Sequence, residues 1–252
     1  MGRGKASDAD RLMALLWRAG GHARPRGPRP ALTVEQLIAA AVAIADKDGI
    51  AKLTIRAVAT RLKVAPMSVY TYVPGKSELL MLMLDNLLLE MKVSEPVNES
   101  WRARVRALAD DNHRLYTEHP WIAELPPNRP PLGPGTIGKY ERELAVFAGL
   151  GLSDLQIDLA LTFVLNFVAS CALSTARARA EISDSAQTDS EWWTTQEPAL
   201  ARLLPTLDAR YPLASRIGSA SAEAQKGTYD PEHHYQFGLA RVLDGLAGLI
   251  EQ

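Results

Sequence analysis

The chain has 252 residues, of which 47% are hydrophobic and 23% are charged, and its formal net charge is −1. Ordinary folded proteins have this composition, so it excludes wholesale disorder, a collagen-like fibre and a mucin-like stalk. The single cysteine, Cys171, excludes an internal disulfide framework and a cysteine-based zinc cluster, and it fits a reducing cytoplasm. The first thirty residues hold charges and prolines instead of an apolar stretch, so we expect no secretory signal peptide.

Charge is divided unevenly along the chain. Residues 1–76 carry a net charge of +8, whereas residues 77–252 carry −9. A basic segment followed by an acidic one predicts that the first part binds a polyanion and that the second part has a different task. Chance clustering of solvated charges is the alternative explanation.

Helices are predicted throughout, because alternating strand patterns are absent and Ala- and Leu-rich segments recur between Pro and Gly breaks. Residues 10–17 predict a short amphipathic helix, and residues 20–30 predict a basic arm with Arg24, Arg26 and Arg29. Four helices are then expected from capping residues and periodicity: one from Thr33 to Asp48, one from Thr54 to Leu62, one starting near Ala65, and one from Ser77 to about Met91.

The second half of the chain also predicts helices, separated by breaks at residues 94–100, 119–135 and 149–153, with a polar loop at 181–190. An uncharged run of eighteen residues follows Asp158 and is near the threshold for a membrane-spanning helix. Polar side chains inside the run favour a helix of a protein core or subunit interface instead. The last helix has an apolar face from Tyr235 to Ile250, and glycines near one face would let a partner backbone approach: Gly238, Gly245 and Gly248.

Residues 53–76, LTIRAVATRLKVAPMSVYTYVPGK, predict two short helices joined by a tight turn. Core positions such as Val58 and Val69 would hold the second helix at a steep angle and push it outward, where it fits a DNA major groove about 12 Å wide. Its outer face would present Ala65, Pro66, Met67, Ser68, Tyr70, Thr71 and Tyr72. A helical hairpin without a ligand is the alternative, but an exposed aromatic pair bracketed by cations favours nucleic acid. These cations are Arg56, Arg61, Lys63 and Lys76.

From Thr33 to Leu80 the sequence resembles the DNA-binding domain of the TetR family of one-component regulators, through GIAKLTIRAVATRLKVAPMSVYTYVPGKSELL. The resemblance implies that Thr54 and Arg56 meet phosphate or a base edge and that residues 65–68 contact bases. It also implies that Tyr70 and Tyr72 brace the backbone and that Lys76 offers its charge to a phosphate. The sequence departs from the family at Lys63, where glycine is usual in the turn.

The resemblance continues beyond this domain. Residues 151–173 are similar to the long eighth helix of the tetracycline repressor, and HPW with RPPLGPG is typical of a related C-terminal domain. An all-α fold is therefore expected, with three parts: a basic arm (1–31), a helix-turn-helix domain (32–78) and a helical effector-binding and dimerisation domain (79–252). The resemblance also implies a homodimer, formed through helices near 153–178 and 232–250 as a four-helix bundle.

Members of this family usually respond to a small molecule, so an effector pocket is expected in the C-terminal domain. Polar or aromatic residues within apolar helices are the candidates: Asn86, His113, Tyr116, Trp121, Tyr140, Thr162 and Asn166. For each one, a hydrogen bond inside the core or the subunit interface is the alternative role. Asn166 is the leading candidate, because a mid-helix amide in the most apolar run needs partners.

Enzyme chemistry has no support in the sequence, which lacks GxSxG, Walker and HExxH motifs, and no metal site of the protein is predicted. No cofactor is expected beyond the effector, whose identity is open; a metal-chelated ligand is compatible with the family. The predicted function is a cytoplasmic repressor that binds a palindromic operator as a dimer and is released by the effector. The alternative is a DNA-binding regulator that has no small effector and responds to a protein partner.

Overall fold

The computed structural model describes residues 8–17, 32–94, 99–126, 129–185, 187–203, 207–225 and 230–251, and every regular element in these ranges is helical. The predicted all-α class is thereby confirmed. The chain forms two compact units that divide between Thr162 and Phe163, inside the long helix α8 (Asp154–Ser185). The basic arm predicted for residues 20–30 lies outside the described residues.

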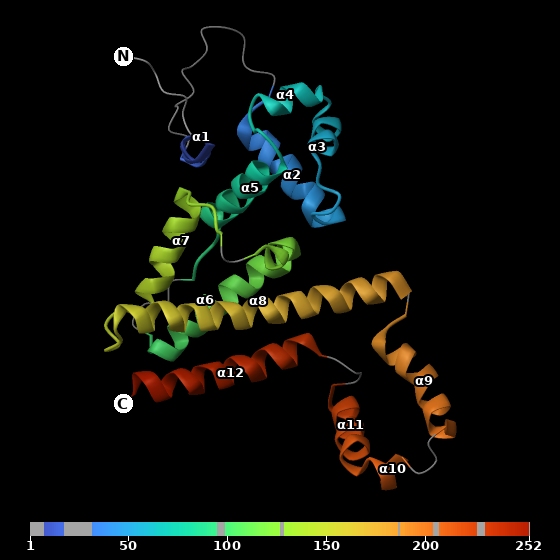
Figure 1. The fold of residues 1–252 in the computed structure, drawn as a ribbon. Helices are drawn as coiled ribbons and strands as arrows, with labels where there is room; N and C mark the ends of the chain where they lie inside the picture. Colours follow the sequence, from blue (N-terminus) through green and yellow to red (C-terminus); the bar gives the residue numbers. More distant parts are fainter. Residues whose placement is uncertain are drawn as a thin grey trace, which may run out of the picture. The chain divides into compact units, whose positions relative to one another are not determined.

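The first unit begins with five helices, which Figure 1 shows in blue to green. They are α1 (Asp8–Leu16), α2 (Val34–Asp48), α3 (Ile55–Leu62), α4 (Pro66–Tyr70) and α5 (Lys76–Glu90). Thr33 caps α2 as predicted, in a capping box with Gln36, and Gly49 follows its end with φ 79°. These bounds confirm the helices that capping residues and periodicity predict.

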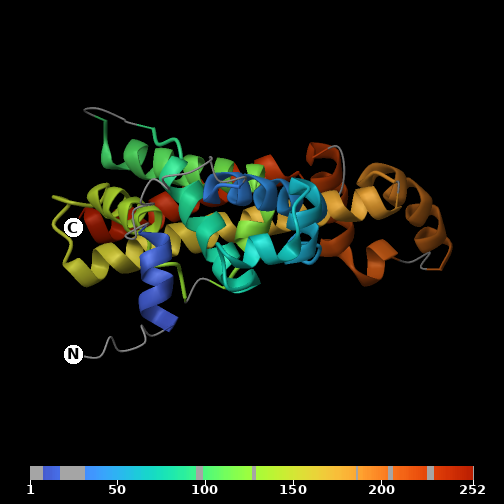
Figure 2. The same ribbon diagram turned by 90° about the horizontal axis from the view of Figure 1, so that it is seen from above.

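A shared core holds these helices together. Helix α2 packs against both α3 and α5, α3 packs against α4, and α1 packs against α5 (Figures 1 and 2). Leu37, Val58 and Val69 are fully buried at the centre. Trp17, just after α1, donates its indole N–H to the carbonyl of Leu132 at 2.9 Å, which ties the first helix to the segment preceding α7.

The first unit continues with α6 (Trp101–Glu118), the short 3-10 helix η1 (Pro120–Glu124) and α7 (Pro134–Ala145). The N-terminus of α7 is bound to the middle of α5. The buried carboxylate of Asp85 accepts the backbone N–H groups of Gly135 at 3.2 Å and of Thr136 at 2.8 Å. A Cβ at Gly135 would lie 1.8 Å from the Asp85 carbonyl oxygen, so only glycine allows this approach.

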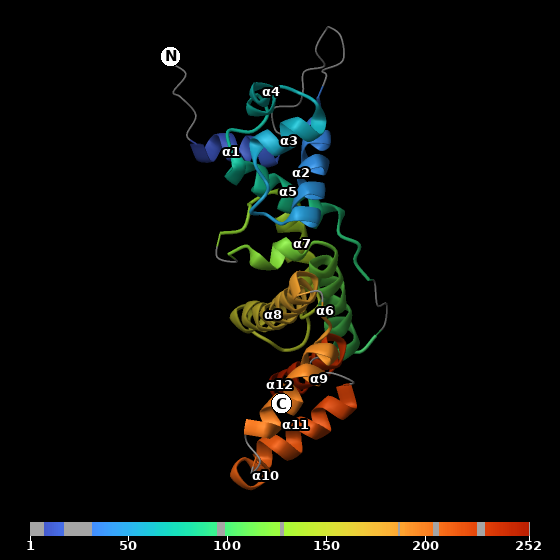
Figure 3. The same ribbon diagram turned by 90° about the vertical axis from the view of Figure 1, so that its right-hand side faces the viewer.

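The second unit contains the C-terminal part of α8 and four further helices, drawn in orange to red in Figure 3. They are α9 (Asp189–Leu203), α10 (Leu207–Arg210), α11 (Pro212–Gln225) and α12 (Pro231–Ile250). Phe167 of α8 stacks on Tyr235 of α12 with ring centroids 5.9 Å apart. A Cβ at Gly238 would lie 2.5 Å from the Phe167 ring, so this glycine admits a side chain of its own chain and not, as predicted, a partner backbone.

Two further expectations need correction. The predicted loop at 181–190 is helical up to Ser185, because the good helix formers around Arg177, Arg179 and Glu181 extend α8. The apolar face of α12 is not left open for a partner, since Leu239, Val242 and Leu246 are buried within the single chain. Gly245, by contrast, has open space where a side chain would lie.

Helix α8 is long and apolar enough over Asp154–Ile182 to cross a membrane by length and composition alone. Core helices of soluble proteins meet the same criteria. Leu161, Val164 and Val168 are buried, whereas Leu155, Leu159 and Phe163 are exposed, so one face of α8 packs against the protein and another face does not.

Candidate nucleic-acid interface and ligand cavity

The outer face of α4 is exposed while its inner face is anchored in the core. Val69 is fully buried, whereas Met67 is 72% exposed and Tyr70 is 47% exposed. Most of the predicted DNA-contacting residues share this exposure: Thr54, Arg56, Ala65, Pro66, Thr71 and Lys76. Ser68 and Tyr72 are half-buried, so the exposed aromatic pair predicted from the sequence is reduced to Tyr70. The structure therefore brings the predicted residues of α3, the turn and α4 onto an accessible part of the first unit.

Several of these polar groups also make hydrogen bonds within the protein. The Thr54 hydroxyl oxygen accepts the N–H of Ala57 at 3.0 Å and caps α3. Tyr72 donates its hydroxyl to the Leu32 carbonyl at 2.5 Å, and Lys76 donates from Nζ to the Ile50 carbonyl at 2.7 Å. Both long side chains thus hold the ends of the helix-turn-helix segment in place, and an ammonium group such as that of Lys76 has three donors, of which this hydrogen bond uses one.

The turn between α3 and α4 has the geometry that a glycine usually provides. Lys63 has φ 58° and ψ 40°, in the left-handed region, and it is the only described non-glycine residue with positive φ. Its N–H reaches the carbonyls of Ala59 and Thr60, which ends α3. The departure from the family pattern at Lys63 therefore leaves the turn intact at the cost of some backbone strain.

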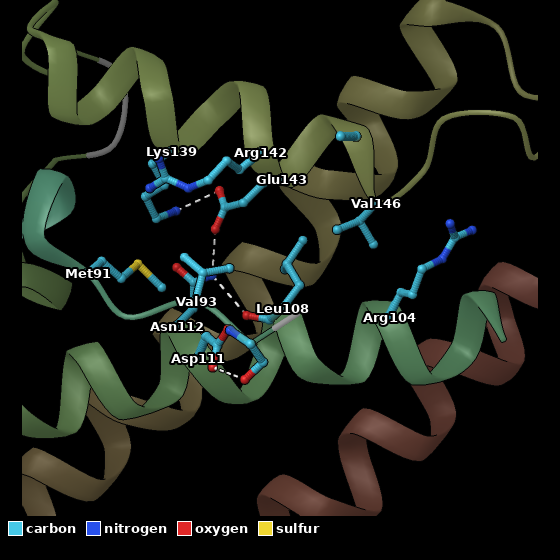
Figure 4. Close-up of a pocket in the computed structure, with 12 residues that line it drawn as sticks. Met91, Val93, Arg104, Leu108, Asp111, Asn112, Lys139, Arg142, Glu143 and Val146 are labelled. Atoms are coloured by element: carbon cyan, nitrogen blue, oxygen red, sulfur yellow. Dashed lines mark hydrogen bonds and ion pairs between the residues drawn. The ribbon is translucent and has the colours of Figure 1, made fainter. Parts of the chain in front are cut away.

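A cavity of about 260 Å³ lies between α6, α7 and the segment that follows α5. Met91, Val93, Leu108, Ala145 and Val146 supply apolar walls (Figure 4). The polar lining comes from both helices and the segment before α6: Ser94, Arg104, Asp111, Asn112, Lys139, Arg142 and Glu143. All these residues belong to the first unit, which also carries α3 and α4.

Polar and charged side chains on one side of the cavity form two hydrogen-bonded groups, one around Glu143 and one around Asp111 (Figure 4). Glu143 accepts from Lys139 Nζ at 2.6 Å and from Asn112 Nδ2 at 2.6 Å, and Asn112 also donates to the Leu108 carbonyl at 2.9 Å. Asp111 accepts the Ser94 N–H at 2.6 Å and pairs with Arg114. Both carboxylates of the cavity wall are therefore already neutralised by partners from the protein.

None of the seven residues predicted for the effector pocket lines this cavity. Tyr116 interacts with one cavity residue, Glu143, through charge. Burial raises the pKa of the Tyr116 phenol to about 12, and the negative charge of Glu143 adds to the shift. Trp121 is buried and donates to the Asp46 carboxylate at 2.7 Å, which joins η1 to α2. Tyr140 is exposed and donates to Asp158 at 2.6 Å. The other four are His113 and Asn86, both half-buried, and Thr162 and Asn166, both exposed on α8.

The cavity residues carry a weak sequence signal that the prediction did not use. Val105, Leu108, Ala109 and Leu115 recur at helical spacing on the buried face of α6, and Asn112 falls on that same face. A buried amide among apolar positions requires polar partners from a neighbouring helix. Lys139 and Glu143, four residues apart on α7, are those partners, but only the packing of α6 against α7 reveals it.

Across the described ranges, no three His, Cys, Asp or Glu side chains gather in a way that could hold a metal ion.

Comparison with known proteins places these features in a family. Residues 37–82 match the model of bacterial regulatory proteins of the tetR family, and residues 95–250 match that of the tetracyclin repressor-like C-terminal domain. The HTH-type transcriptional repressor DrrR1 of Streptomyces coeruleorubidus is 36% identical over 250 residues, which cover 98% of this chain and 88% of DrrR1.

Solved structures agree. ActR of Streptomyces coelicolor in complex with actinorhodin has a TM-score of 0.68 at 25% identity, covering 90% of this chain and 100% of ActR. ActR in complex with (S)-DNPA has a TM-score of 0.63 at 27% identity, covering 87% and 99%. Both family models, the 36% identical repressor and the exposed helix-turn-helix lead to one conclusion. The chain belongs to the TetR family of transcriptional regulators.

Proposed function

We propose that this protein is a dimeric repressor that releases its DNA when a small molecule enters the cavity between α6 and α7. The main observation is that one compact unit contains both the exposed helix α4 and the cavity. DrrR1 is named a repressor, and ActR has been crystallised with two small molecules, which supports the same roles here. A DNA target implies a cytoplasmic location.

Helix α5 provides the physical connection between the two sites. It begins at Lys76, directly after the helix-turn-helix segment, and Met91 at its end lines the cavity. Asp85, midway along α5, holds the N-terminus of α7, which contributes Lys139 and Glu143 to the cavity wall. A ligand that displaces α7 would therefore move α5 and change the presentation of α4.

The dimer is proposed to form through the exposed face of α8. Leu155, Leu159 and Phe163 are each more than half exposed and lie four residues apart, so they form one apolar row on α8. Thr162 and Asn166 are exposed beside this row, which favours the subunit interface over the pocket for both residues. An apolar row of this kind is stabilised when a second copy covers it.

A regulator controlled by a protein partner remains the second candidate, but the cavity favours a small molecule. Its largely apolar walls with a few polar groups are typical of small-molecule sites.

Selection of duplexes from a random DNA pool tests the proposal. We expect enrichment of a palindrome whose half-sites are about 34 Å apart, one helical turn. Arg56→Ala should weaken binding to the selected site, while Arg216→Ala, an exposed arginine on α11, should leave it unchanged. A pool without an enriched palindrome would contradict the proposed function.

A further inference from the structure

The wall of the cavity contains two buried polar groups that have no hydrogen-bond partner among the described residues. Asn112 is completely buried; both hydrogens of its amide nitrogen are used, but its Oδ1 has no hydrogen-bond partner among the described residues. Buried acceptors without donors are rare, because each costs free energy. A ligand that donates a hydrogen bond would remove this cost.

Arg104 supplies the second group. Its Nε is buried without a partner, and no described carboxylate pairs with its guanidinium. The two carboxylates of the wall, Asp111 and Glu143, are engaged by Arg114 and Lys139. Because the carboxylates of this partly apolar cavity are already paired with other cations, the Arg104 guanidinium is left to bind an anion from outside the protein.

The spacing of the two groups sets the length of the ligand. Arg104 precedes Asn112 by eight residues on α6, which corresponds to about 12 Å along the helix axis. Figure 4 shows Arg104 apart from the cluster of Asn112, Lys139 and Glu143. Leu108 lies between them on the helix, and Val146, directly after α7, also lines the cavity, so the middle of the cavity is apolar.

We propose that the cavity binds an elongated, largely apolar organic acid whose carboxylate faces Arg104 and whose hydroxyl or N–H group faces Asn112. This assignment rests on the proposed function, because it names the ligand class of the same cavity. The paired charges of Lys139 and Glu143 add specificity, since they disfavour a second unpaired charge at the Asn112 end.

The test uses 4′-hydroxybiphenyl-4-carboxylate, a rigid apolar body with a hydroxyl at one end and a carboxylate at the other. Its methyl ester removes the charge, and biphenyl-4-carboxylate removes the hydroxyl. Titration calorimetry on the full chain, without DNA, gives the three dissociation constants. We expect the acid to bind at least about tenfold more tightly than its ester, as a charge-assisted hydrogen bond implies, and more tightly than the compound without the hydroxyl.

Variants of the protein then show which residue causes the preference for the carboxylate and which causes the preference for the hydroxyl. Arg104→Met should abolish the preference for the acid over the ester, Arg104→Lys should retain part of it, and Asn112→Ala should abolish the preference for the hydroxyl. Arg102→Met is the matched control, because Arg102 is on the same helix but stacks on Trp101 and does not line the cavity. Thermal melting confirms that each variant is folded.

Equal affinity for acid and ester, retention of the preference in Arg104→Met, or no binding of any of the three compounds at millimolar concentration would overturn the assignment. The proposed function fails on a separate measurement, the selection of DNA duplexes. Because the titrations contain no DNA, a wrong ligand class and a wrong regulatory function give different results.

Discussion

Arg56 and Lys76 lie at the two ends of the helix-turn-helix segment, and both are exposed. Cations in these places fit contacts to phosphate, which position a protein on DNA without reading its sequence. We expect a different role for the exposed Met67 of α4, because a thioether can contact a thymine methyl group but carries no charge for a phosphate. Substitutions of Arg56 or Lys76 should therefore change the affinity for all DNA, whereas substitutions of Met67 should change the preference for particular base pairs.

Arg56→Ala and Lys76→Ala should each weaken binding to all duplexes and reduce the salt dependence of the affinity by about one unit of slope. The reason is that each cation displaces counterions from one phosphate. Binding constants measured at several salt concentrations check this prediction. A slope identical to that of the parent would remove the residue from the interface.

Lys63→Gly should raise the free energy of unfolding by about 0.5 to 1 kcal/mol, because glycine adopts the left-handed conformation without strain. Urea denaturation measures the difference. Lys52→Gly is the control: Lys52 has no positive φ, so the same change there should not stabilise the protein. Stabilisation by both variants, or by neither, would contradict the strain at Lys63.

Tyr116 should make stability depend on alkaline pH. The raised pKa of about 12 means that the folded protein keeps its phenol proton where the unfolded chain, with a pKa of about 10, loses it. This contribution is complete below pH 10 and is lost as the pH rises from 10 to 12, by on the order of 2 kcal/mol. Denaturation of the parent and of Tyr116→Phe across this range should show a shallower decline in the variant; parallel curves would contradict the prediction.

At the scale of elements, α5 and α7 are joined by hydrogen bonds and by close backbone packing. The Asp85 carboxylate caps α7 from the side of α5, and Gly135 permits backbone contact between the two helices. An N-cap supplied by a residue fifty positions earlier in the chain couples the helices more firmly than apolar packing alone, because hydrogen bonds fix orientation. We therefore expect a displacement of α7 to be transmitted to α5.

Asp85→Ala should lower the free energy of unfolding by about 2 kcal/mol, because two buried or half-buried N–H groups lose their acceptor. Asp85→Asn retains one acceptor oxygen and should lose less. Urea denaturation gives both values, with Asp154→Ala, an exposed residue at the start of α8, as the control. Asp85→Ala with the stability of the parent would show that the cap does not hold α7.

At the scale of the whole molecule, the proposed interface is the exposed row on α8 and not the apolar face of α12. Leu246 is only 5% exposed within one chain, whereas Leu159 is 57% exposed and Phe163 is 52% exposed. Substitutions on the two helices should therefore have different consequences. The α12 residue supports the fold, and the α8 residues support assembly.

Leu159→Glu and Phe163→Glu should each weaken the dimer by at least about tenfold, since each removes apolar burial and introduces a charge into the interface. Operator binding should fall with dimer formation while the first unit stays folded. Sedimentation velocity measures the association. Ile217→Glu, an exposed substitution on α11, should have no effect, and Leu246→Glu should instead destabilise the protomer. Undiminished association of both α8 variants would place the interface elsewhere.

The sequence by itself determined the class, the helices and the DNA-binding segment. Caps such as Thr33 and Thr54, the turn at Lys63 and the buried positions of α3 and α4 are local, so periodicity and capping chemistry predict them. The exposure of the α4 face follows from the same pattern, because Val69 must be buried and Met67 then points outward.

Only the tertiary structure decided where the cavity lies. It also decided which glycines and apolar faces make contacts within one protomer and which are left exposed. Asn112 meets Glu143 across 31 positions, and Asp85 meets Thr136 across 51, and no local pattern specifies such pairs. Gly238 likewise admits Phe167 of its own chain, which the face of a single helix could not reveal. Helical periodicity specifies that a face is buried, but the helix that covers it is chosen by packing between distant segments.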